Sequence, residues 1–405
     1  MGATPSTINA ALKETWTESR IAEQLYNENP LLSRIKRLNN TQMGEYALTP
    51  IHVGRNWGFT TTPAAGGALN DAGNQSYAQA QWAYTNQHVQ VAIQGSAIDQ
   101  TKGDALSVAS VVDEEVTGAV NDLNRNLTRQ IFSDGDAVIA QCGTTSNSTT
   151  VQLNTTSGYD AIERGWLDVG AKIDIGTAAD GDSVADGVTI TAVDLANSQI
   201  TISGSGITTS SSHFVVLSGS KGAAGTTAGL EMNGLGNIVG TGDLGGITVS
   251  ATPAWQAAKV DSSTTTLTLA AFYALNQAIA QKTGKPSDFA VTSLKVQRLA
   301  YTLLQGQVRF ASDKPLVAGS VEGVDINGVN LVGVPDCKNA QAYFLTLSDL
   351  FTVSAGDPYW QNRVSGGNIL EWRQGFDEYV AKITTRMNIG VRRRNSHAKL
   401  TAIAS

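Results

Sequence analysis

The chain has 405 residues and a net charge of −7, which excludes a protein that coats nucleic acid by direct neutralisation, because such a protein needs clustered Lys and Arg. Hydrophobic residues make up 41% of the chain, and no apolar run approaches the roughly 20 residues of a membrane helix. Charged residues make up only 16%, against about 25% in a typical soluble domain. This deficit indicates either a subunit whose surface is covered by neighbours or a β protein rich in Thr, Ser and Asn.

Residues 6–38 are predicted to form an amphipathic helix followed by a shorter one, because apolar residues recur along one stripe until Pro30 interrupts the pattern. The segment is an arm with an apolar face that needs a partner. We expect Trp16 and Tyr26 on this arm to contact a neighbouring subunit, or else to belong to the core of the chain itself.

Residues 44–94 are predicted to form a very long hairpin. Its outgoing arm, GEYALTPIHVGRNWGF, and its returning arm, SYAQAQWAYTNQHVQVAIQ, flank a stretch of low complexity. Each arm of about 15 residues reaches on the order of 50 Å. An isolated ribbon of that length is barely stable in water, so we expect it to lie on another surface; the alternative is a disordered loop. The aromatic residues expected at an interface, or alternatively in the core, are Trp57, Phe59, Trp82 and Tyr84.

Residues 104–136 contain the strongest periodic signal in the chain. Apolar residues recur at spacings of three and four, which predicts one helix of about 28 residues. Asp104 suits its N-cap and Gly135 its C′ position, and Gly118 suggests that another segment packs closely there. The apolar positions are Leu106, Ala109, Val112, Val116, Val120, Leu123, Leu127 and Ile131.

The second half of the chain changes character twice. Residues 137–230 are rich in Gly, Ser, Thr and Asp with short alternating runs (KIDIG, GVTITAV, QITIS and HFVVL), which predict a small β barrel or sandwich. Residues 231–405 return to a mixed α/β pattern, with helices in TLTLAAFYALNQAIAQKTGKP and TSLKVQRLAYTLLQG and a hairpin at Asn327-Gly328. Strands are predicted in AYFLTLSDLFTV and EYVAKITTRMNIGVRRR. The basic run Arg392, Arg393 and Arg394 is either a solvated hairpin end or a set of salt bridges between subunits.

The sequence G-x-G-x-x-G from Gly240 to Gly245 is the main candidate for a cofactor site. A dinucleotide fingerprint needs a helix directly after it, whereas GITVSATPAW follows here, with β-branched residues and Pro253. We therefore interpret this segment as a joint between two parts of the chain.

The other reactive side chains stand alone in the sequence. Cys142 and Cys337 give neither a disulfide framework nor a metal spacing, which suits a reducing compartment. No histidine has a partner at ligand spacing, so surface or interface positions are expected for His52, His88, His213 and His397. We expect no catalytic, cofactor or metal site and no enzyme activity.

Segments in the order just described resemble the major capsid proteins of tailed bacteriophages with the Hong Kong 97-type fold. DLNRNLTRQIFSDGD (122–136) is similar to the end of that family's spine helix and its exit turn. LEMNGLGNIVGTGDLGGI (230–247) is similar to the entry to its axial domain, and TTRMNIGVRRRNSHAKLTAI (384–403) to its closing strand and tail. The resemblance implies an α+β, Hong Kong 97-like capsid fold with an inserted small β domain. The implied parts are an N-terminal arm (1–38), the extension loop with peripheral-domain strands (39–103), the spine helix (104–136), the inserted β-rich domain (137–230), the axial domain (231–375), and the closing strand and C-terminal tail (376–405).

By this resemblance, the chain is expected to assemble in a host bacterial cytoplasm, away from membranes, into pentamers and hexamers of an icosahedral virion capsid. Some relatives join the extension loop to a neighbour through a lysine–asparagine isopeptide bond, but no lysine lies between Lys36 and Lys102, so no such cross-link is expected. The expected partners are further copies of the chain, a scaffolding protein, a portal, a decoration protein, and packaged double-stranded DNA contacted weakly. Relatives with built-in scaffolds begin with a long, charged helical prodomain, whereas this sequence begins directly with the arm. A separate scaffolding protein, or prior cleavage, is therefore implied.

Two other readings remain open at this point. An encapsulin-like nanocompartment shares the fold but encloses protein cargo. A β-rich tail fibre or adhesin is suggested by residues 137–230 and predicts a slender trimer.

Overall fold

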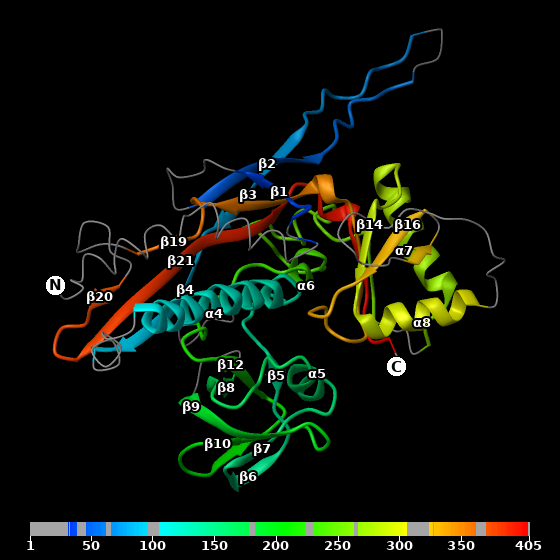
Figure 1. Cartoon of the computed structure of the whole chain (residues 1–405). Helices are drawn as coiled ribbons and strands as arrows, with labels where there is room; N and C mark the ends of the chain where they lie inside the picture. Colours follow the sequence, from blue (N-terminus) through cyan, green and yellow to red (C-terminus); the bar gives the residue numbers. More distant parts are fainter. Residues whose placement is uncertain are drawn as a thin grey trace.

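The computed structural model combines sheets and helices in an elongated molecule from which one hairpin projects (Figure 1). The predicted helices of the N-terminal arm, its Trp16 and Tyr26, and the proposed N-cap Asp104 lie outside the described residues. The side chains of residues 105–116 are also outside the description. The structure describes residues 31, 33–38, 46–61, 66–95, 105–177, 183–222, 230–262, 266–305, 324–326, 328–361 and 370–403.

A long mixed sheet is built around β21 (Glu378–Val391), the strand predicted in EYVAKITTRMNIGVRRR. Antiparallel neighbours pair with it along both edges, and β1 continues the sheet in parallel to β18. β18 and β21 pack closely where Phe351 lies opposite Gly390. A Cβ added to Gly390 would lie 2.6 Å from the Phe351 ring, so only glycine fits there. The other strands of this sheet are β1 (Lys36–Leu38), β4 (Thr85–Gln94), β18 (Leu350–Ser354), β19 (Tyr359–Trp360) and β20 (Glu371–Trp372).

The predicted long helix is confirmed as α4 (Ala105–Ile131), which lies along this sheet beside β4 (Figure 1). Val120, Leu123 and Leu127 are almost fully buried, as their three- and four-residue spacing requires. The described residues do not make the close contact expected at Gly118, since a Cβ at that position would meet none of their atoms within 4 Å.

The predicted hairpin is confirmed as the β2–β3 ribbon, formed by β2 (Tyr46–Gly54) and β3 (Ser76–Ala83) in antiparallel register. Its returning arm is shorter than expected, because the chain leaves the ribbon at Tyr84 and continues as β4 in the long sheet. Alternation alone cannot locate this change, since it continues through both strands while the pairing partner changes from β2 to β21.

A second mixed sheet, in the strand order β13-β22-β17-β14-β16-β15, packs against two helices. Both helices and the hairpin near Gly328 are confirmed, and helix α7 ends at Gly284, whose φ of 80° requires glycine. AYFLTLSDLFTV is not one strand: a 3₁₀ turn at Leu347–Asp349 divides it, and its halves join different sheets. The elements are β13 (Lys259–Asp261), α7 (Leu269–Thr283), β14 (Phe289–Thr292), α8 (Leu294–Gln305), β15 (Val324–Ile326), β16 (Val329–Gly333), β17 (Ala342–Leu345) and β22 (Ala398–Leu400).

Residues 140–217 form a β-rich module below α4 (Figure 1) with a separate hydrophobic core. Its main sheet has the order β5-β12-β8-β9-β10-β7, and β6 pairs with β11 beside it. All four strand runs predicted from alternation are present. The elements are β5 (Ala140–Gln141), β6 (Thr145–Ser148), β7 (Thr150–Gln152), α5 (Ser157–Glu163), β8 (Lys172–Thr177), β9 (Ser183–Asp194), β10 (Gln199–Ile202), β11 (Ile207–Thr209) and β12 (His213–Leu217).

Candidate intersubunit surface

The base of the β2–β3 ribbon is packed into the chain's own core. Trp82 is fully buried, its indole nitrogen donates to Thr49 Oγ1 at 3.1 Å, and its ring meets Phe351 edge-on at 6.1 Å. Tyr84 is half-buried against the same core. Of the two placements expected for Trp82, a subunit interface or the core of the chain, the structure shows the core: β18, far away in the sequence, covers the indole from within the chain.

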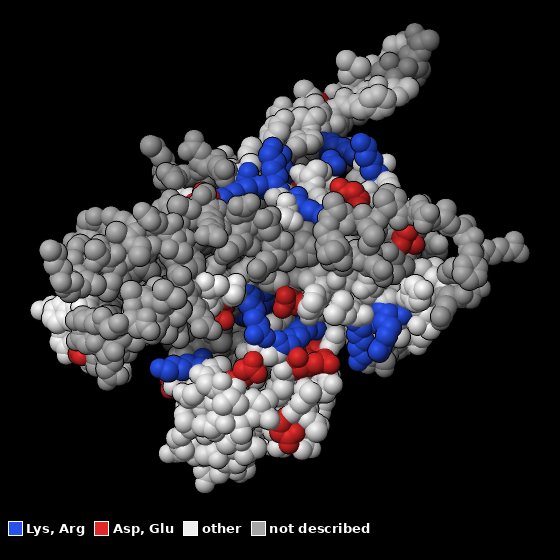
Figure 2. All heavy atoms as spheres, viewed as in Figure 1, with Lys and Arg blue, Asp and Glu red and all other residues white. Residues whose placement is uncertain are grey.

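The distal part of the ribbon, residues 54–61 and 66–77, exposes its apolar side chains instead. Trp57 and Phe59 are each 82% exposed. The two arms stay together beyond the regular ladder because Asn70 donates through its backbone to Thr60 Oγ1 and through its side chain to the carbonyl of Phe59. Figure 1 shows this part projecting beyond the body, and no cluster of charge is visible on it in Figure 2. We call this surface the ribbon tip; its exposed large apolar residues are Trp57, Phe59, Leu69 and Tyr77.

Arg394 organises the glycine-rich segment from within. The side chain is 1% exposed and donates to the backbone carbonyls of Asn237 and Ile238, at the end of the short helix α6 (Leu235–Ile238), and to those of Gly242 and Trp255. It is thus a structural side chain that bonds to its own chain, and the expectation of a solvated or intersubunit Arg394 is wrong. Burial lowers its pKa to about 10, so the guanidinium stays charged at neutral pH.

The G-x-G-x-x-G segment joins the ribbon to this arginine. Gly245 accepts a backbone hydrogen bond from Gln81 of β3 at 2.8 Å, next to the buried Trp82. The carbonyl of Gly242 accepts from Arg394, so this backbone offers oxygen acceptors to a cation rather than N–H donors to a phosphate. The interpretation of the segment as a joint agrees with these contacts.

Arg392 and Arg393 remain on the surface after β21. The Arg392 guanidinium lies 5.7 Å from the centre of the Phe351 ring, a cation–π distance, and its backbone N–H donates to Asp349. Lys and Arg gather near the base of the ribbon and above the β-rich module on the face that Figure 2 shows. Both arginines are therefore placed where a neighbouring chain could reach them.

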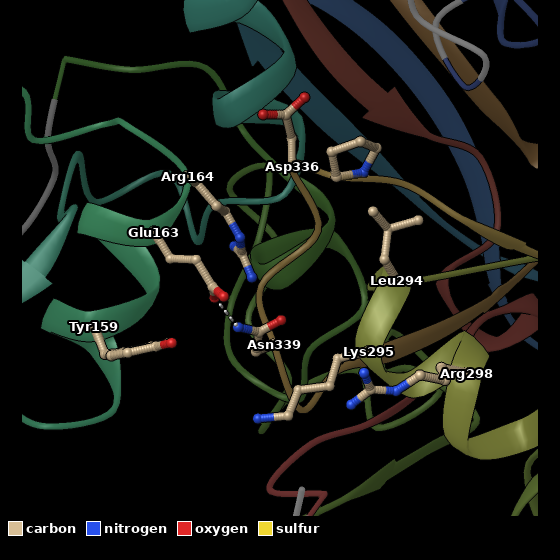
Figure 3. Close-up of a pocket in the computed structure, with 9 residues that line it drawn as sticks. Tyr159, Glu163, Arg164, Leu294, Lys295, Arg298, Asp336 and Asn339 are labelled. Carbon is tan, nitrogen blue, oxygen red and sulfur yellow. Dashed lines mark hydrogen bonds between the residues drawn. The ribbon is translucent and has the colours of Figure 1, made fainter. Parts of the chain in front are cut away.

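A cavity of about 760 Å³ lies between α5 of the β-rich module, the first turn of α8 and the connection that follows β16. Figure 3 shows Lys295 and Arg298 extending from α8, Glu163 from α5 bonded to Asn339, and the Asp336 carboxyl pointing away from these residues. Sequence reasoning missed this cavity, because its walls come from segments more than 100 residues apart. Its lining residues are Tyr159, Glu163, Arg164, Leu294, Lys295, Arg298, Pro335, Asp336 and Asn339.

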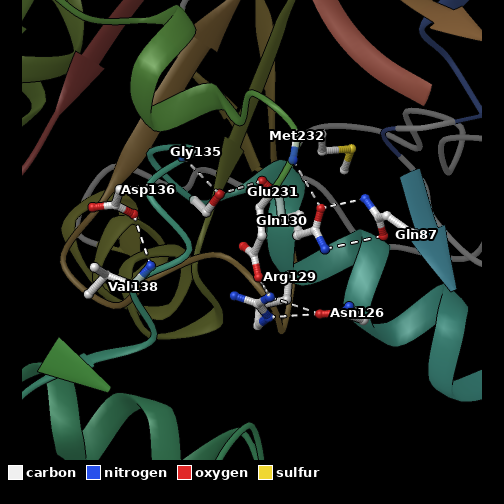
Figure 4. A network of polar contacts seen from close by, with 10 residues as sticks. Gln87, Asn126, Arg129, Gln130, Gly135, Asp136, Val138, Glu231 and Met232 are labelled. Carbon is white, nitrogen blue, oxygen red and sulfur yellow. Dashed lines mark hydrogen bonds and ion pairs between the residues drawn. The ribbon is translucent and has the colours of Figure 1, made fainter. Parts of the chain in front are cut away.

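A buried polar network fixes the end of α4 (Figure 4). Arg129 forms an ion pair with Glu231, with side chains only 4% and 2% exposed, and also donates to Asn126. Gln130 exchanges hydrogen bonds with Gln87 of β4 at 2.6 and 3.2 Å. The network therefore connects the long helix both to the long sheet and to the segment that leaves the β-rich module. No local sequence pattern predicted this connection.

His397 is buried, so the expectation of a surface or interface position is wrong for this histidine. Its Nδ1 accepts from the backbone N–H of Thr346 at 3.3 Å. Burial, followed by the positive charge of Arg394, lowers its pKa to about 3, which keeps the ring neutral. Cys142 and Cys337 are free and buried, and burial raises the pKa of each thiol to about 12, where it is unreactive at neutral pH.

Within the described ranges, His, Cys, Asp and Glu side chains form no group of three or more that could hold a metal ion. Across those same ranges, each helix is too short or too polar to span a bilayer.

The sequence matches no family model and no curated protein. Among solved structures, the chain is similar to a chain of the cyanophage A-1(L) capsid asymmetric unit, with a TM-score of 0.54 and 12% identity over 93% of both chains. A chain of the capsid of a native GTA particle (TM-score 0.48, 8% identity, 93% of this chain and 90% of that one) and a chain from Mycobacterium phage Patience (0.47, 10%, 98% and 87%) also match. The chain therefore has the fold of a bacteriophage capsid protein.

Proposed function

We propose that this chain is the major capsid protein of a tailed bacteriophage, which assembles into pentamers and hexamers of an icosahedral shell around double-stranded DNA. The fold shared with the cyanophage capsid chain supports the proposal. The observation that carries it is the ribbon tip, whose Trp57 and Phe59 leave most of their surface in water.

The physical argument rests on what can cover this surface. Exposed aromatic clusters mark interaction sites, because apolar area in water costs about 25 cal/mol per Å². The base of the ribbon is fixed by Trp82 and Gln81, so the tip is held away from the body. In a closed symmetric assembly each tip lies on the next copy, and the same contact repeats around the shell.

The domain assignments of the Hong Kong 97-type fold belong to the same proposal. Residues 39–103 act as the extension loop, 104–136 as the spine helix, 137–230 as an inserted domain and 231–375 as the axial domain. The structure adds one qualification: β18, β19 and β20, within residues 350–372, pair in the sheet of β21, so the two mixed sheets are not divided at residue 375. Trp57, Phe59, Tyr84, Arg392 and Arg393 stay as proposed interface residues.

The proposed partners follow from this role. They are further copies of the chain, a scaffolding protein, a portal and a decoration protein, with no catalysis and no isopeptide cross-link. A net charge of −7 supports weak contact with the packaged DNA. A motor, and not charge neutralisation by the shell, then drives the DNA into the particle.

Assembly of variants tests the proposal. The double variant Trp57→Ser/Phe59→Ser should fold but fail to form closed particles in electron microscopy and sedimentation, because the tip loses its apolar contact. Leu195→Ser, on an exposed turn of the β-rich module, is the matched control and should assemble normally. Normal shells from the double variant would contradict the proposal.

The contents of the particles distinguish the encapsulin-like alternative, which no observation favours. Phage-derived particles should absorb as nucleic acid, whereas protein cargo without DNA would support the alternative. A slender trimer in the same images would support the adhesin reading.

A further inference from the structure

The β-rich module has a hydrophobic core that it shares with no other part of the described chain. Every residue of this core lies between Ile139 and Leu217, and the other hydrophobic clusters of the described residues contain no residue from that range. Between the module and the α8 region lies the cavity of about 760 Å³, so open space separates the two there. Because apolar burial is the main source of firm attachment, other contacts must keep the module in its place below α4 (Figure 1).

Asn339, in the connection that follows β16, makes the first of these contacts. Its backbone N–H donates to Asp160 Oδ2 of α5 at 3.0 Å, and its side-chain amide donates to Asp160 Oδ1 and, at 3.2 Å, to Glu163 Oε2. The Asp160 carboxylate also pairs with Arg164, one helical turn later, at 3.4 Å. One asparagine from outside the module is therefore bonded to two acidic side chains of one module helix; Figure 3 shows its bond to Glu163.

Arg125 of α4 makes the second contact, at the C-terminal end of the same helix. Its Nη2 donates to the backbone carbonyls of Arg164, at 2.6 Å, and Gly165, at 2.9 Å, which directly follow α5. The carbonyls at the end of a helix lack partners within the helix and carry partial negative charge, so a guanidinium is favoured there. Arg125 is exposed, and its hydrogen bonds can therefore be exchanged for bonds to water at little cost.

The two connections that lead into and out of the module lie next to each other. The backbone N–H of Ile139 donates to Val215 at 2.9 Å, and the entering strand β5 pairs with the leaving strand β12. The entry passes Gly135 (φ 78°) directly after α4, and the exit passes Gly219 (φ 83°). A few residues at the ends of elements are sufficient as a hinge. Two adjacent connections therefore permit the module to rotate, and the contacts at α5 oppose this rotation.

We propose that α5 is a latch for the β-rich module. With Asn339 and Arg125 bonded to α5, the module is held in the orientation of Figure 1. When these hydrogen bonds are exchanged for water, the module swings as a rigid unit about its two connections, while its own core and the other hydrophobic clusters stay packed. The inference does not depend on shell assembly and is tested on the unassembled chain.

The test measures the distance between two spin labels in the full-length chain by double electron–electron resonance. The labels are attached through Leu195→Cys, on an exposed turn of the module, and Tyr301→Cys, on the exposed face of α8. The latch variant Arg125→Met/Asn339→Ala should raise the ratio of displaced to native distances by about tenfold or more, since each lost hydrogen bond changes an equilibrium by about fivefold. The matched control Arg393→Met/Asn121→Ala removes the same residue types from exposed positions outside the latch and should keep the parent's distances.

The native cysteines distinguish a swinging module from an unfolding one. Cys142 is buried in the core of the module, and Cys337 is buried in the main core outside it. Without the label sites, the latch variant should react with N-ethylmaleimide as slowly as the parent does, because both cores stay packed. Faster reaction of Cys142 would mean that the released module unfolds. That result, unchanged distances in the latch variant, or equal displacement in the control would each overturn the proposal.

Discussion

Trp57 and Trp82 belong to the same hairpin and have opposite surroundings. Trp82 is fully buried under Phe351 and bonded to Thr49, whereas Trp57 is 82% exposed. Both residues lie in the two arms predicted for one hairpin, and the difference between them comes from what lies outside the hairpin. At the base of the ribbon, other segments of the chain bury Trp82; at the tip, the described residues leave Trp57 exposed to solvent. The comparison separates the part of the ribbon that stabilises the subunit from the part left for another molecule.

The largest loss of stability is expected at Arg394, which bonds to the glycine-rich segment that holds the base of the ribbon. Arg394→Met should destabilise the unassembled chain by at least about 4 kcal/mol, because the buried carbonyls that the guanidinium serves lose their donor. Urea unfolding followed by fluorescence measures this. Arg393→Met, at an exposed neighbouring position, should stay within about 0.5 kcal/mol. Equal stability of the two variants would mean that Arg394 is not the support of this loop.

Trp82→Ala should cost about 3–4 kcal/mol of unfolding free energy, the range for removal of a large aromatic side chain from a core. The same unfolding experiment applies. A loss below about 1 kcal/mol would show that the base of the ribbon is not packed as described.

Acid should weaken the same region through His397. Its pKa is about 3 in the folded chain and about 6.5 when unfolded, so the unfolded state binds the proton first and stability falls as pH drops below about 6.5. Between about pH 7.5 and about pH 5 this residue removes about 2 kcal/mol. His397→Asn, whose amide oxygen can accept from Thr346, should lose that part of the pH dependence. Parallel pH profiles for parent and variant would contradict the assignment.

The smallest effect on the isolated chain is expected at the tip. Trp57→Ser should change the unfolding free energy by less than about 0.5 kcal/mol, because the side chain has few contacts to lose. A loss comparable to that of Trp82→Ala would place Trp57 in the subunit's own core and remove the contrast between the two tryptophans.

The sequence was sufficient for the elements whose signal is local. The three- and four-residue spacing from Leu106 to Ile131 predicted α4, and Gly284 marked the end of α7. Alternation also predicted the ribbon and the strands of the β-rich module. In each case the residues that specify the element lie within it.

The errors share a different origin. Arg394 and His397 were expected at surfaces, and Trp82 at an interface or in the core; each is buried by segments distant in sequence. The pair Arg129–Glu231 and the cavity around Arg164 likewise join residues more than 100 positions apart, and no spacing pattern reports such contacts. Aromatic and charged residues satisfy the same local pattern whether their own chain or a neighbour covers them, so a single sequence does not distinguish the two.

Electron cryo-microscopy of particles assembled from the full-length chain tests the central claim most directly. The account predicts closed shells in which the ribbon tip of each subunit lies on an adjacent copy, with Trp57 and Phe59 covered by that copy. A soluble monomer at high concentration, or shells in which both side chains remain in solvent, would contradict it.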